Sequence, residues 1–406
     1  MASRMLKFTE IDRTMPEKRA AEARRSDFQE IYGDYAREVA EDQAARCSQC
    51  GVPFCQQGCP LSNNIPDWLK LAAEDRMEEA YQVSQATNNM PEICGRICPQ
   101  DRLCEGICTV EQSGHGTVTI GAMERYITDN AWEQGWVTPI KPPREREQSA
   151  GIIGAGPGGL AAAEQLRRKG YQVTVYDRYD RGGGLLMYGI PGFKLEKDIV
   201  ERRIKRLEDS GITFKYNAGI GEAHSLADLR DEHDTLLIAT GVYKARDLMV
   251  PGAGCEGVHK ALDFLTASNR KGLGDDVPEF ENGTLDAKGR KVVVIGGGDT
   301  AMDCVRTAIR QGATSVSCLY RRDRANMPGS QREVTNAEEE GVVFEWLASP
   351  EALVDDDAGK LKAVRASRMK LGAPDPSGRQ SPEKTGETFD IEADMVIKAL
   401  GFDPED

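Results

Sequence analysis

The cysteines of this chain are concentrated in one stretch, and their spacing favours metal–sulfur chemistry. Eight of the eleven cysteines lie between Cys47 and Cys108. They form two runs. The first run contains Cys47, Cys50, Cys55 and Cys59, followed by Pro60, and the second contains Cys94, Cys98, Cys104 and Cys108. Thiolates are soft ligands, and three close cysteines with a fourth before proline are typical of paired clusters, where the fourth serves the neighbouring cluster. The sequence therefore predicts two 4Fe–4S clusters side by side.

Two other kinds of cysteine site explain this pattern less well. Disulfides form in oxidising compartments, and the N-terminal region Met1–Phe28 is charged throughout, without the apolar run of a signal peptide. Structural zinc sites usually combine C-x2–4-C pairs, often with histidine. Only His115 of the four histidines lies near the cysteines, and the second run has no C-x2-C pair. The spacing favours iron–sulfur clusters, in a protein of the reducing cytoplasm.

A glycine-rich turn of the form G-x-G-x-x-G runs from Gly154 to Gly159. It follows an apolar strand, 150–153, and precedes a helix and a second strand, 171–176, that ends at Asp177. In this setting the glycines permit a tight turn, close approach of a diphosphate and close helix–strand packing. An acid at this distance accepts hydrogen bonds from a ribose. The stretch predicts a dinucleotide-binding βαβ unit.

A second turn, of the form G-x-G-x-x-A, runs from Gly296 to Ala301 after an apolar strand, 292–295. The next strand, 315–320, ends in Arg321 and Arg322, where the first unit has an acid. Guanidinium groups bind a phosphate ester, whereas an acid would repel it. This site should therefore prefer NADP(H) over NAD(H); the plainer alternative is a solvated arginine pair at a strand end.

Composition bounds the possible functions. A chain of 406 residues, 39% hydrophobic and 29% charged, is long enough for two or three globular domains. No window approaches the ~18 consecutive apolar residues of a membrane span, so we expect no membrane association. The net charge of −14 argues against a nucleic-acid partner, because phosphate binding needs a cationic surface. The simplest explanation of this charge is ordinary solubility.

Several elements must position these groups. We expect a solvated helix over 20–45 that supports the cysteine region, and an amphipathic helix over 120–131 that carries Glu124. The sequence also predicts a charged helix over 196–208 and a buried apolar strand over 235–239. A Pro-, Gly- and Ser-rich stretch, 371–387, is expected to be an exposed loop.

The predicted fold class is α/β, with a helical iron–sulfur domain followed by two Rossmann-like dinucleotide-binding domains. The expected boundaries place the iron–sulfur domain with its N-terminal arm at residues 1–148. The family resemblance given below implies that the first part of a FAD-binding domain follows at 149–290, an NADPH-binding domain at 291–398, and a return to the FAD domain that begins at 399–406.

Two dinucleotide sites and two clusters in one chain indicate a single chemistry. NADPH donates a hydride, a flavin accepts it and releases single electrons, and iron–sulfur clusters carry single electrons onward. This work needs no general base, and no nucleophile–base pair is recognisable, so no catalytic side chain is predicted. Cys255, Cys304 and Cys318 lack C-x-x-C spacing and are expected to be buried structural residues.

At this level of detail the chain resembles a known family. The stretches 47–60, 91–108, 118–127, 151–166, 183–197, 292–313 and 320–334 are similar to the small (β) subunit of bacterial NADPH-dependent glutamate synthase. The same architecture occurs in the N-terminal module of dihydropyrimidine dehydrogenase and in the large subunit of an electron-bifurcating NADPH–ferredoxin oxidoreductase. The resemblance covers nearly the whole chain from about residue 8.

The resemblance implies FAD at the first site and NADPH at the second, with the NADPH domain inserted in the FAD domain. In related proteins three cysteines and a Glu or Gln from the following helix hold one cluster. This implies Cys47, Cys50, Cys55 and Glu124 for one cluster and Cys59, Cys98, Cys104 and Cys108 for the other. Cys94 is then left as an uncertain ligand, and whether it or Glu124 completes a cluster stays open.

The resemblance also marks the residues expected to bind the dinucleotides. They are Gly154, Gly156, Pro157, Gly158, Gly159, Asp177, Gly183, Leu185, Thr240 and Gly241 at the first site, and Gly296, Gly298, Asp299, Thr300, Ala301, Arg321 and Arg322 at the second. Family members continue beyond the segment that matches 399–404 to a Gly-Asp motif that contacts the flavin. This sequence ends at Asp406, so either it is partial, which we favour, or this form binds FAD weakly.

The function implied is electron input to glutamate synthase. NADPH reduces FAD, the clusters pass electrons out, and a large (α) partner subunit with glutaminase and FMN sites converts glutamine and 2-oxoglutarate to two glutamates in a hetero-oligomer. A subunit of an NADPH–ferredoxin oxidoreductase, with the same cofactors, is the nearest alternative. A zinc-stabilised, non-catalytic scaffold is the alternative of another class.

Overall fold

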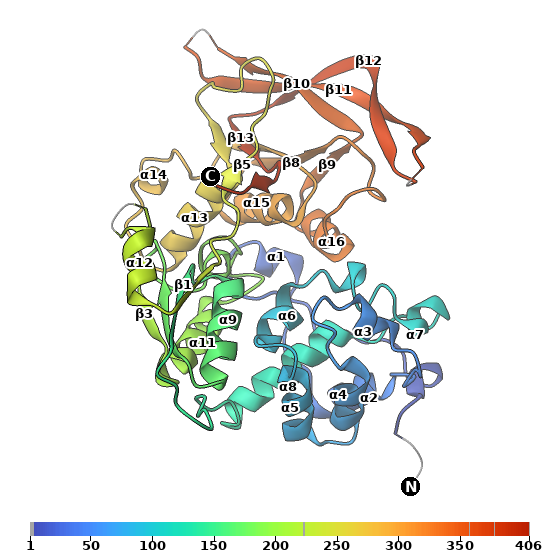
Figure 1. The fold of residues 1–406 in the computed structure, drawn as a ribbon. Coiled ribbons are helices and arrows are strands. Elements are labelled where there is room, and N and C mark those ends of the chain that lie inside the picture. Colours follow the sequence, from blue (N-terminus) through green and yellow to red (C-terminus); the bar gives the residue numbers. More distant parts are fainter. Residues whose placement is uncertain (1–3, 222–223, 357, 377, 406) are drawn as a thin grey trace. The chain divides into compact units, whose positions relative to one another are not determined.

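The computed structural model describes residues 4–221, 224–356, 358–376 and 378–405. Its chain divides into two compact units (Figure 1). The first comprises Met1–Arg19, Glu30–Met187 and Lys194–Gly241, and the second comprises Ala20–Gln29, Tyr188–Phe193 and Val242–Asp406. Of the predicted domains, residues 1–3 of the first and residue 406 of the last lie outside the described residues. The predicted boundaries at 149, 291 and 399 stay predictions.

The cysteine-bearing part of the first unit is helical. Its helices are η1 (Lys7–Thr9), α2 (Arg37–Ala45), α3 (Phe54–Gly58), α4 (Ile65–Ala73), α5 (Met77–Gln85), α6 (Pro91–Ile97), η2 (Gln100–Arg102), α7 (Thr109–Gln112) and α8 (Ile120–Glu133). The predicted amphipathic helix is confirmed by α8, whose apolar face packs against Trp68 and Leu69 of α4 in one core. The Trp68 indole donates to Asn63 Oδ1 at 2.8 Å, which fixes the start of α4.

The prediction of a single helix over 20–45 is wrong. The structure has a four-residue helix, α1 (Ala21–Arg24), then irregular backbone, and then α2. Short polar side chains end the first helix: Ser26 Oγ donates to the Ala23 carbonyl at 2.6 Å, and Asp27 Oδ1 accepts from Gln29 N. Such local side-chain bonds compete with helical ones.

The first unit also contains a parallel sheet in the order β3-β2-β1-β4. Its strands are β1 (Ser149–Ile153), β2 (Gln172–Tyr176), β3 (Thr213–Lys215) and β4 (Thr235–Ile238), with helices α9 (Pro157–Arg168), α10 (Leu185–Tyr188), α11 (Lys197–Asp209) and α12 (Leu226–Glu232). The prediction that 235–239 is buried is wrong. Leu237 is 41% exposed and Ile238 is 64% exposed, because β4 is the edge strand and, among the described residues, pairs only with β1.

The second unit is built on a five-stranded parallel sheet in the order β6-β13-β7-β8-β9. Its strands are β6 (Val258–Lys260), β7 (Lys291–Ile295), β8 (Ser315–Tyr320), β9 (Val343–Trp346) and β13 (Met395–Lys398), with helices α13 (Ala261–Gly272), α14 (Pro278–Glu281), α15 (Asp299–Arg310) and α16 (Gln331–Glu339). A short antiparallel pair, β5 (Lys244–Ala245) and β14 (Phe402–Asp403), joins the chain entering this unit to the chain leaving the sheet.

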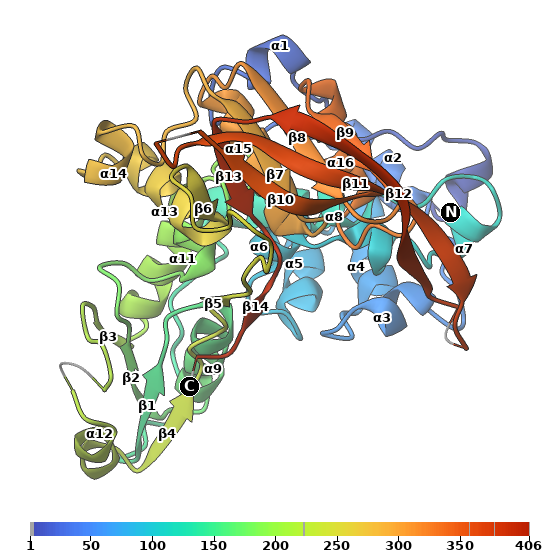
Figure 2. The same cartoon turned by 90° about the horizontal axis from the view of Figure 1, so that it is seen from above.

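A long antiparallel hairpin extends the second unit (Figure 2). Strands β10 (Ala348–Asp355), β11 (Leu361–Pro374) and β12 (Gln380–Glu392) form a three-stranded sheet. The prediction of a loop over 371–387 is therefore wrong for 371–374 and 380–387, which are strand, and residue 377 lies outside the described residues. Register shifts on either side of Met369–Leu371 accommodate the irregular sequence, and Pro382 lies on an edge strand, β12, where proline is tolerated.

The N-terminal helix α1 belongs to the second unit through a buried ion network. Arg24, 1% exposed, pairs with Glu339 and with Glu340, which lies 3.5 Å from its Nε. Arg306 and Arg310 of α15 bind the same Glu340 carboxylate. Parallel sheets flanked by helices, after a helical cysteine region, confirm the predicted α/β fold class.

Candidate functional site

Four cysteines of the first unit line one small cavity. They are Cys47 after α2, Cys50 in the following loop, Cys55 of α3 and Cys108 at the start of α7. The wall between them is largely apolar and includes Leu69, Val118 and Ile120. Three cysteines of the first run and one of the second thus share one site.

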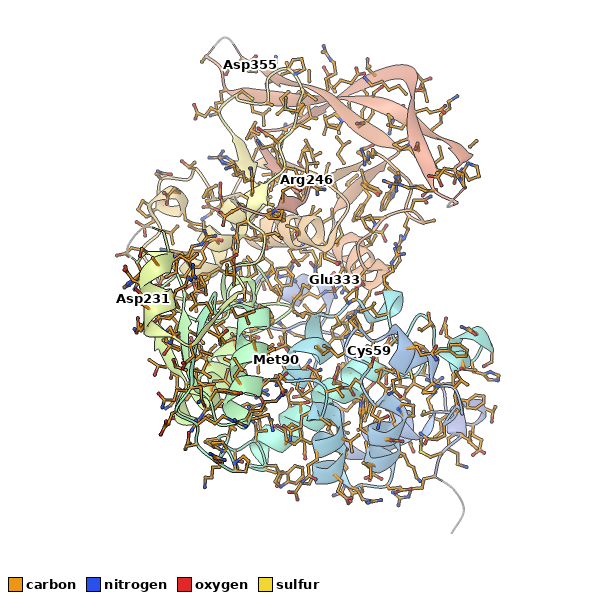
Figure 3. All side chains as sticks on the ribbon, viewed as in Figure 1. Cys59, Met90, Asp231, Arg246, Glu333 and Asp355 are labelled. Atoms are coloured by element: carbon orange, nitrogen blue, oxygen red, sulfur yellow. The ribbon has the colours of Figure 1, made fainter. Side chains whose placement is uncertain are left out.

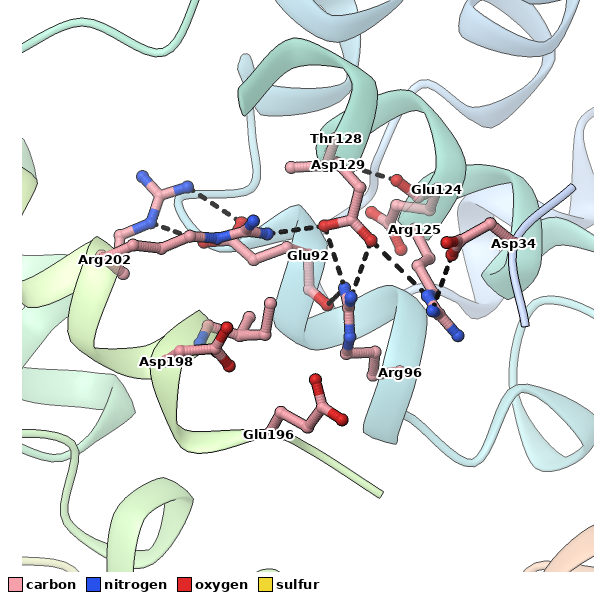
Figure 4. Close-up of polar contacts among 12 residues, drawn as sticks. Asp34, Glu92, Arg96, Glu124, Arg125, Thr128, Asp129, Glu196, Asp198 and Arg202 are labelled. Carbon is pink, nitrogen blue, oxygen red and sulfur yellow. Dashed lines mark hydrogen bonds and ion pairs between the residues drawn. The ribbon is translucent and has the colours of Figure 1, made fainter. Parts of the chain in front are cut away.

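The other four cysteines of the two runs lie in the neighbourhood of Glu124 of α8. Cys104 interacts electrostatically with Glu124 and Cys59, and Cys94 with Cys98. Glu124 is buried and accepts a hydrogen bond from Asn88 Nδ2 at 3.0 Å. The Cys94 thiol donates to Asn88 Oδ1 at 3.7 Å. Figure 3 labels Cys59 in this helical region, and Figure 4 shows Glu124 on its helix.

This arrangement groups the side chains differently from the expected division of ligands. Cys108, rather than Glu124, lies with Cys47, Cys50 and Cys55. The resemblance alone could not separate the two, because residues 108 and 124 both follow the second run and only the fold decides which cavity each one reaches. Glu124 instead lies with the second group.

The cysteine sites suit a group that stabilises thiolates. Burial raises the pKa of Cys47 to about 11 and that of Cys55 to about 12, and it raises the pKa of Cys104 and of the Glu124 carboxyl as well. Bound iron would offset this cost by holding the thiolate form. Within the described ranges, no three His, Cys, Asp or Glu side chains converge on a position for one metal ion. In a 4Fe–4S cluster each ligand binds a different iron, so its ligands stand further apart.

The first glycine turn has open and closed positions. A Cβ at Gly159 would lie 1.9 Å from the Gly154 carbonyl oxygen, so only glycine allows this helix–strand contact. At Gly156 and Gly158 a Cβ would meet nothing within 4 Å. That open face, at the N-terminus of α9, fits the diphosphate of a dinucleotide. Pro157 opens the helix, as its fixed φ favours.

Most residues predicted for the first site lie around this turn. Asp177 is buried and accepts hydrogen bonds from the backbone nitrogens of Ala155 at 2.7 Å and Tyr179 at 2.9 Å. Gly183 donates to the Ala155 carbonyl at 2.8 Å, and Leu185 begins the short helix α10 after it. Thr240 and Gly241 follow β4, where Ala239 O would lie 2.4 Å from a Cβ at Gly154. The structure brings these residues together.

The second glycine turn opens onto a cavity of about 800 Å³ in the second unit. Gly296, Gly298, Thr300, Arg321 and Arg322 line it, as the sequence predicted for a shared site. A volume of this size is within the range of small-molecule pockets. A Cβ at Gly298 would meet nothing within 4 Å, so a ligand can approach the backbone there.

Two residues predicted for this site do not line the cavity. Asp299 Oδ1 accepts from Ser330 N at 3.0 Å and thereby holds the next loop, and Ala301 is fully buried against the sheet. Two cavity arginines were not predicted, Arg246 beside β5 and Arg379 at the hairpin. No local pattern marks them, because their positions depend on contacts distant in sequence.

Comparisons with known proteins match the cysteine region and the nucleotide-binding region to two families. Residues 24–136 match the family described as dihydropyrimidine dehydrogenase domain II, 4Fe–4S cluster, and residues 149–406 match the pyridine nucleotide-disulphide oxidoreductases. The small chain of glutamate synthase [NADPH] from Azospirillum brasilense is 64% identical over 404 residues, 99% of this chain and 83% of that protein. This chain belongs to the family of glutamate synthase [NADPH] small chains. The Escherichia coli small chain is 44% identical over 405 residues, 100% of this chain and 85% of that protein.

Family membership confirms the coarse predictions. The chain is an NADPH-dependent flavin oxidoreductase with a 4Fe–4S domain, and as a small chain it has a larger subunit as partner. The solved structure of Mycobacterium tuberculosis FprA in complex with NADPH supports the fold, with a TM-score of 0.54 at 22% identity, over 63% of this chain and 71% of that one. Among the described residues no helix is long and apolar enough to cross a membrane.

Proposed function

We propose that this chain is the electron-input subunit of glutamate synthase and that it holds two 4Fe–4S clusters. The observation that carries the proposal is the pair of cysteine groups in the same compact unit as the first glycine turn. We assign Cys47, Cys50, Cys55 and Cys108 to one cluster and Cys59, Cys98, Cys104 and Glu124 to the other. Cys94 is then left without iron, because each 4Fe–4S cluster takes four ligands.

The charge of the residues after each glycine turn decides which dinucleotide we assign to it. We assign FAD to the first turn, where Gly156 and Gly158 leave room for a diphosphate and Asp177 lies at the end of β2. We assign NADPH to the second turn, where Arg321 and Arg322 take the place of the acid. A bound flavin supplies the conversion of a hydride into single electrons, and the clusters supply the onward path.

The role of the protein is to bind and orient the dinucleotides and clusters and to exclude water from them. The backbone at each glycine turn would bind a diphosphate, and the buried and half-buried cysteines of the two runs would hold the clusters. We propose that the larger chain carries the glutaminase and FMN sites and forms glutamate, because the described residues of this chain contain no evident nucleophile–base pair for amide hydrolysis. A reducing cytoplasm suits a protein that depends on free thiolates.

The test compares the reactions of the isolated chain with those of the chain combined with its larger partner. The isolated, anaerobically reconstituted chain should reduce an artificial acceptor with NADPH and form no glutamate from glutamine and 2-oxoglutarate. Adding the larger chain should produce glutamate. Glutamate formed by this chain alone would contradict the proposal. A co-purifying ferredoxin-linked partner, with no gain of glutamate synthesis, would favour the NADPH–ferredoxin oxidoreductase instead.

A further inference from the structure

The turn of the β11–β12 hairpin carries an arginine whose backbone is firmly held. Asp375 N donates to the Arg379 carbonyl at 2.9 Å, and Arg379 N donates to Asp375 Oδ1 at 3.0 Å. Gln380 Nε2 donates to the Gly372 carbonyl at 3.1 Å. The hairpin therefore presents Arg379 from a closed turn, and the side chain lines the same cavity as Arg321 and Arg322.

Three guanidinium groups thus converge on one end of the second cavity. All three act on Tyr320, the last residue of β8: burial raises the pKa of this phenol, and the positive charges of Arg322, Arg321 and Arg379 oppose that rise. The glycine turn at 296–298 lies in the wall of the same cavity. Arginines gathered from two separate elements therefore share one space with the dinucleotide turn.

No carboxylate of the described chain forms an ion pair with these three arginines. The acid in the cavity wall, Asp247, pairs with Lys398 at 2.5 Å, and the fourth cavity arginine, Arg246, pairs with Asp403 at 2.8 Å. In the described part of the chain, the buried Nε of Arg322 also has no hydrogen-bond partner. Like charges held together without a counter-charge repel one another, so this arrangement is stabilised when an anion binds.

We propose that Arg379 is a specificity-determining residue that binds the 2′-phosphate of NADPH together with Arg321 and Arg322. The inference rests on the proposed NADPH site and adds a residue from a separate hairpin to it. A phosphate monoester carries a charge near −2 at neutral pH and accepts several charge-assisted hydrogen bonds, which matches three guanidiniums better than one. The diphosphate of the same ligand is left to the glycine turn.

The test measures binding of fragments that differ by the one phosphate. The probes are 2′,5′-ADP and 5′-AMP. Each is titrated calorimetrically into the parent chain and into Arg379→Gln, both loaded with FAD and iron–sulfur clusters but free of NADPH. We expect Arg379→Gln to weaken the binding of 2′,5′-ADP about 10-fold or more and to leave the binding of 5′-AMP unchanged. This is the size expected for the loss of a hydrogen bond to a charged group. Arg379→Lys should recover part of the loss, and added salt should shrink the difference, because Arg379 is exposed.

A matched control separates binding from folding of the hairpin. Arg365 lies on the same hairpin and pairs with Asp390 at 2.8 Å, but it does not line the cavity. Arg365→Gln should bind both probes as the parent chain does. Equal affinity of Arg379→Gln and the parent chain for 2′,5′-ADP, or equal losses for both probes, would overturn the inference. A parent chain that does not prefer 2′,5′-ADP would instead overturn the proposed NADPH specificity itself.

Discussion

Arg203 donates two hydrogen bonds to the carboxylate of Glu92, from Nε at 2.7 Å and from Nη2 at 2.9 Å. The two side chains are 2% and 0% exposed. A third arm of the same guanidinium lies 3.7 Å from Glu164 Oε2. Glu92 is on α6, the helix of Cys94, and Glu164 is on α9, which starts at the first glycine turn. One arginine of α11 thereby joins the cysteine region to the nucleotide-binding region within the first unit.

The pair lies beside a wider network (Figure 4). Asp129 of α8 accepts from Arg96 of α6 at 2.7 Å and from Arg202 of α11 at 2.6 Å. Arg96 also donates to Glu30 at 2.7 Å. Each carboxylate has a guanidinium partner, so the cost of burying these charges is offset by specific hydrogen bonds.

Removing one member of the Arg203–Glu92 pair should greatly lower the free energy of unfolding. Arg203→Met leaves Glu92 buried without its partner, and breaking a buried pair in this way costs about 3–5 kcal/mol. The double variant Arg203→Met/Glu92→Leu should lose less than the sum of the single variants. Urea unfolding followed by circular dichroism checks both. Arg365→Gln, which breaks an exposed pair, should lose less than about 1 kcal/mol, and a similarly small loss in Arg203→Met would contradict the expectation.

Two glycines of the first turn should fail in different ways. Gly159→Ala places a methyl group 1.9 Å from the Gly154 carbonyl oxygen, so the helix–strand contact cannot form and the unit should be destabilised. Gly156→Ala meets no protein atom within 4 Å, so the apoprotein should fold normally but bind FAD poorly. Thermal unfolding and flavin content of each variant distinguish the two. Normal flavin content in Gly156→Ala would exclude that glycine from the diphosphate site.

The ligand assignment predicts different iron losses for Cys94 and Cys108, two cysteines of the second run. Cys108→Ser should lose about four of about eight iron atoms, because a cluster needs four ligands. Cys94→Ser should retain all of them. Glu124→Ala should alter the iron content and the electron paramagnetic resonance signal of the other cluster. Iron and acid-labile sulfide counts after anaerobic reconstitution measure this, and equal losses in Cys94→Ser and Cys108→Ser would refute the assignment.

His259 of β6 should make stability depend on pH. Burial lowers its pKa, the positive charge of Arg290 adds to the effect, and Asp263 opposes it. A lowered pKa means that the folded state disfavours the proton, so stability is complete above the unfolded pKa of about 6.5 and falls as pH decreases through that value toward the folded pKa. His259→Gln should flatten the decline in urea midpoint between about pH 7 and pH 5. An unchanged pH slope in that variant would assign the decline to other groups.

Local pattern was sufficient for some parts of this molecule and not for others. The spacing of Ile120, Met123 and Ile127 identified α8, and the glycine turns identified both βαβ units, because these signals come from neighbouring residues. The placement of Cys108 with the first cysteine run depends on how the loop after α6 folds back, which no short window contains. The apolar sequence of β4 indicated a strand, but its exposure depends on its edge position. The hairpin was missed because proline, glycine and serine usually mark loops, whereas here pairing between distant residues holds the strands.

The ion network around Arg24 has a consequence for how the chain is made. Arg24 and its partner Glu339 are separated by 315 positions. A ribosome adds about 5–20 residues per second, so ~16–63 s pass between the synthesis of the arginine and that of its partner. During that interval helix α1 has no place to dock, and the guanidinium stays in water. The second unit should therefore close only after helix α16 has been synthesised, and nascent chains stalled before residue 339 should be cleaved by proteases around residues 20–29.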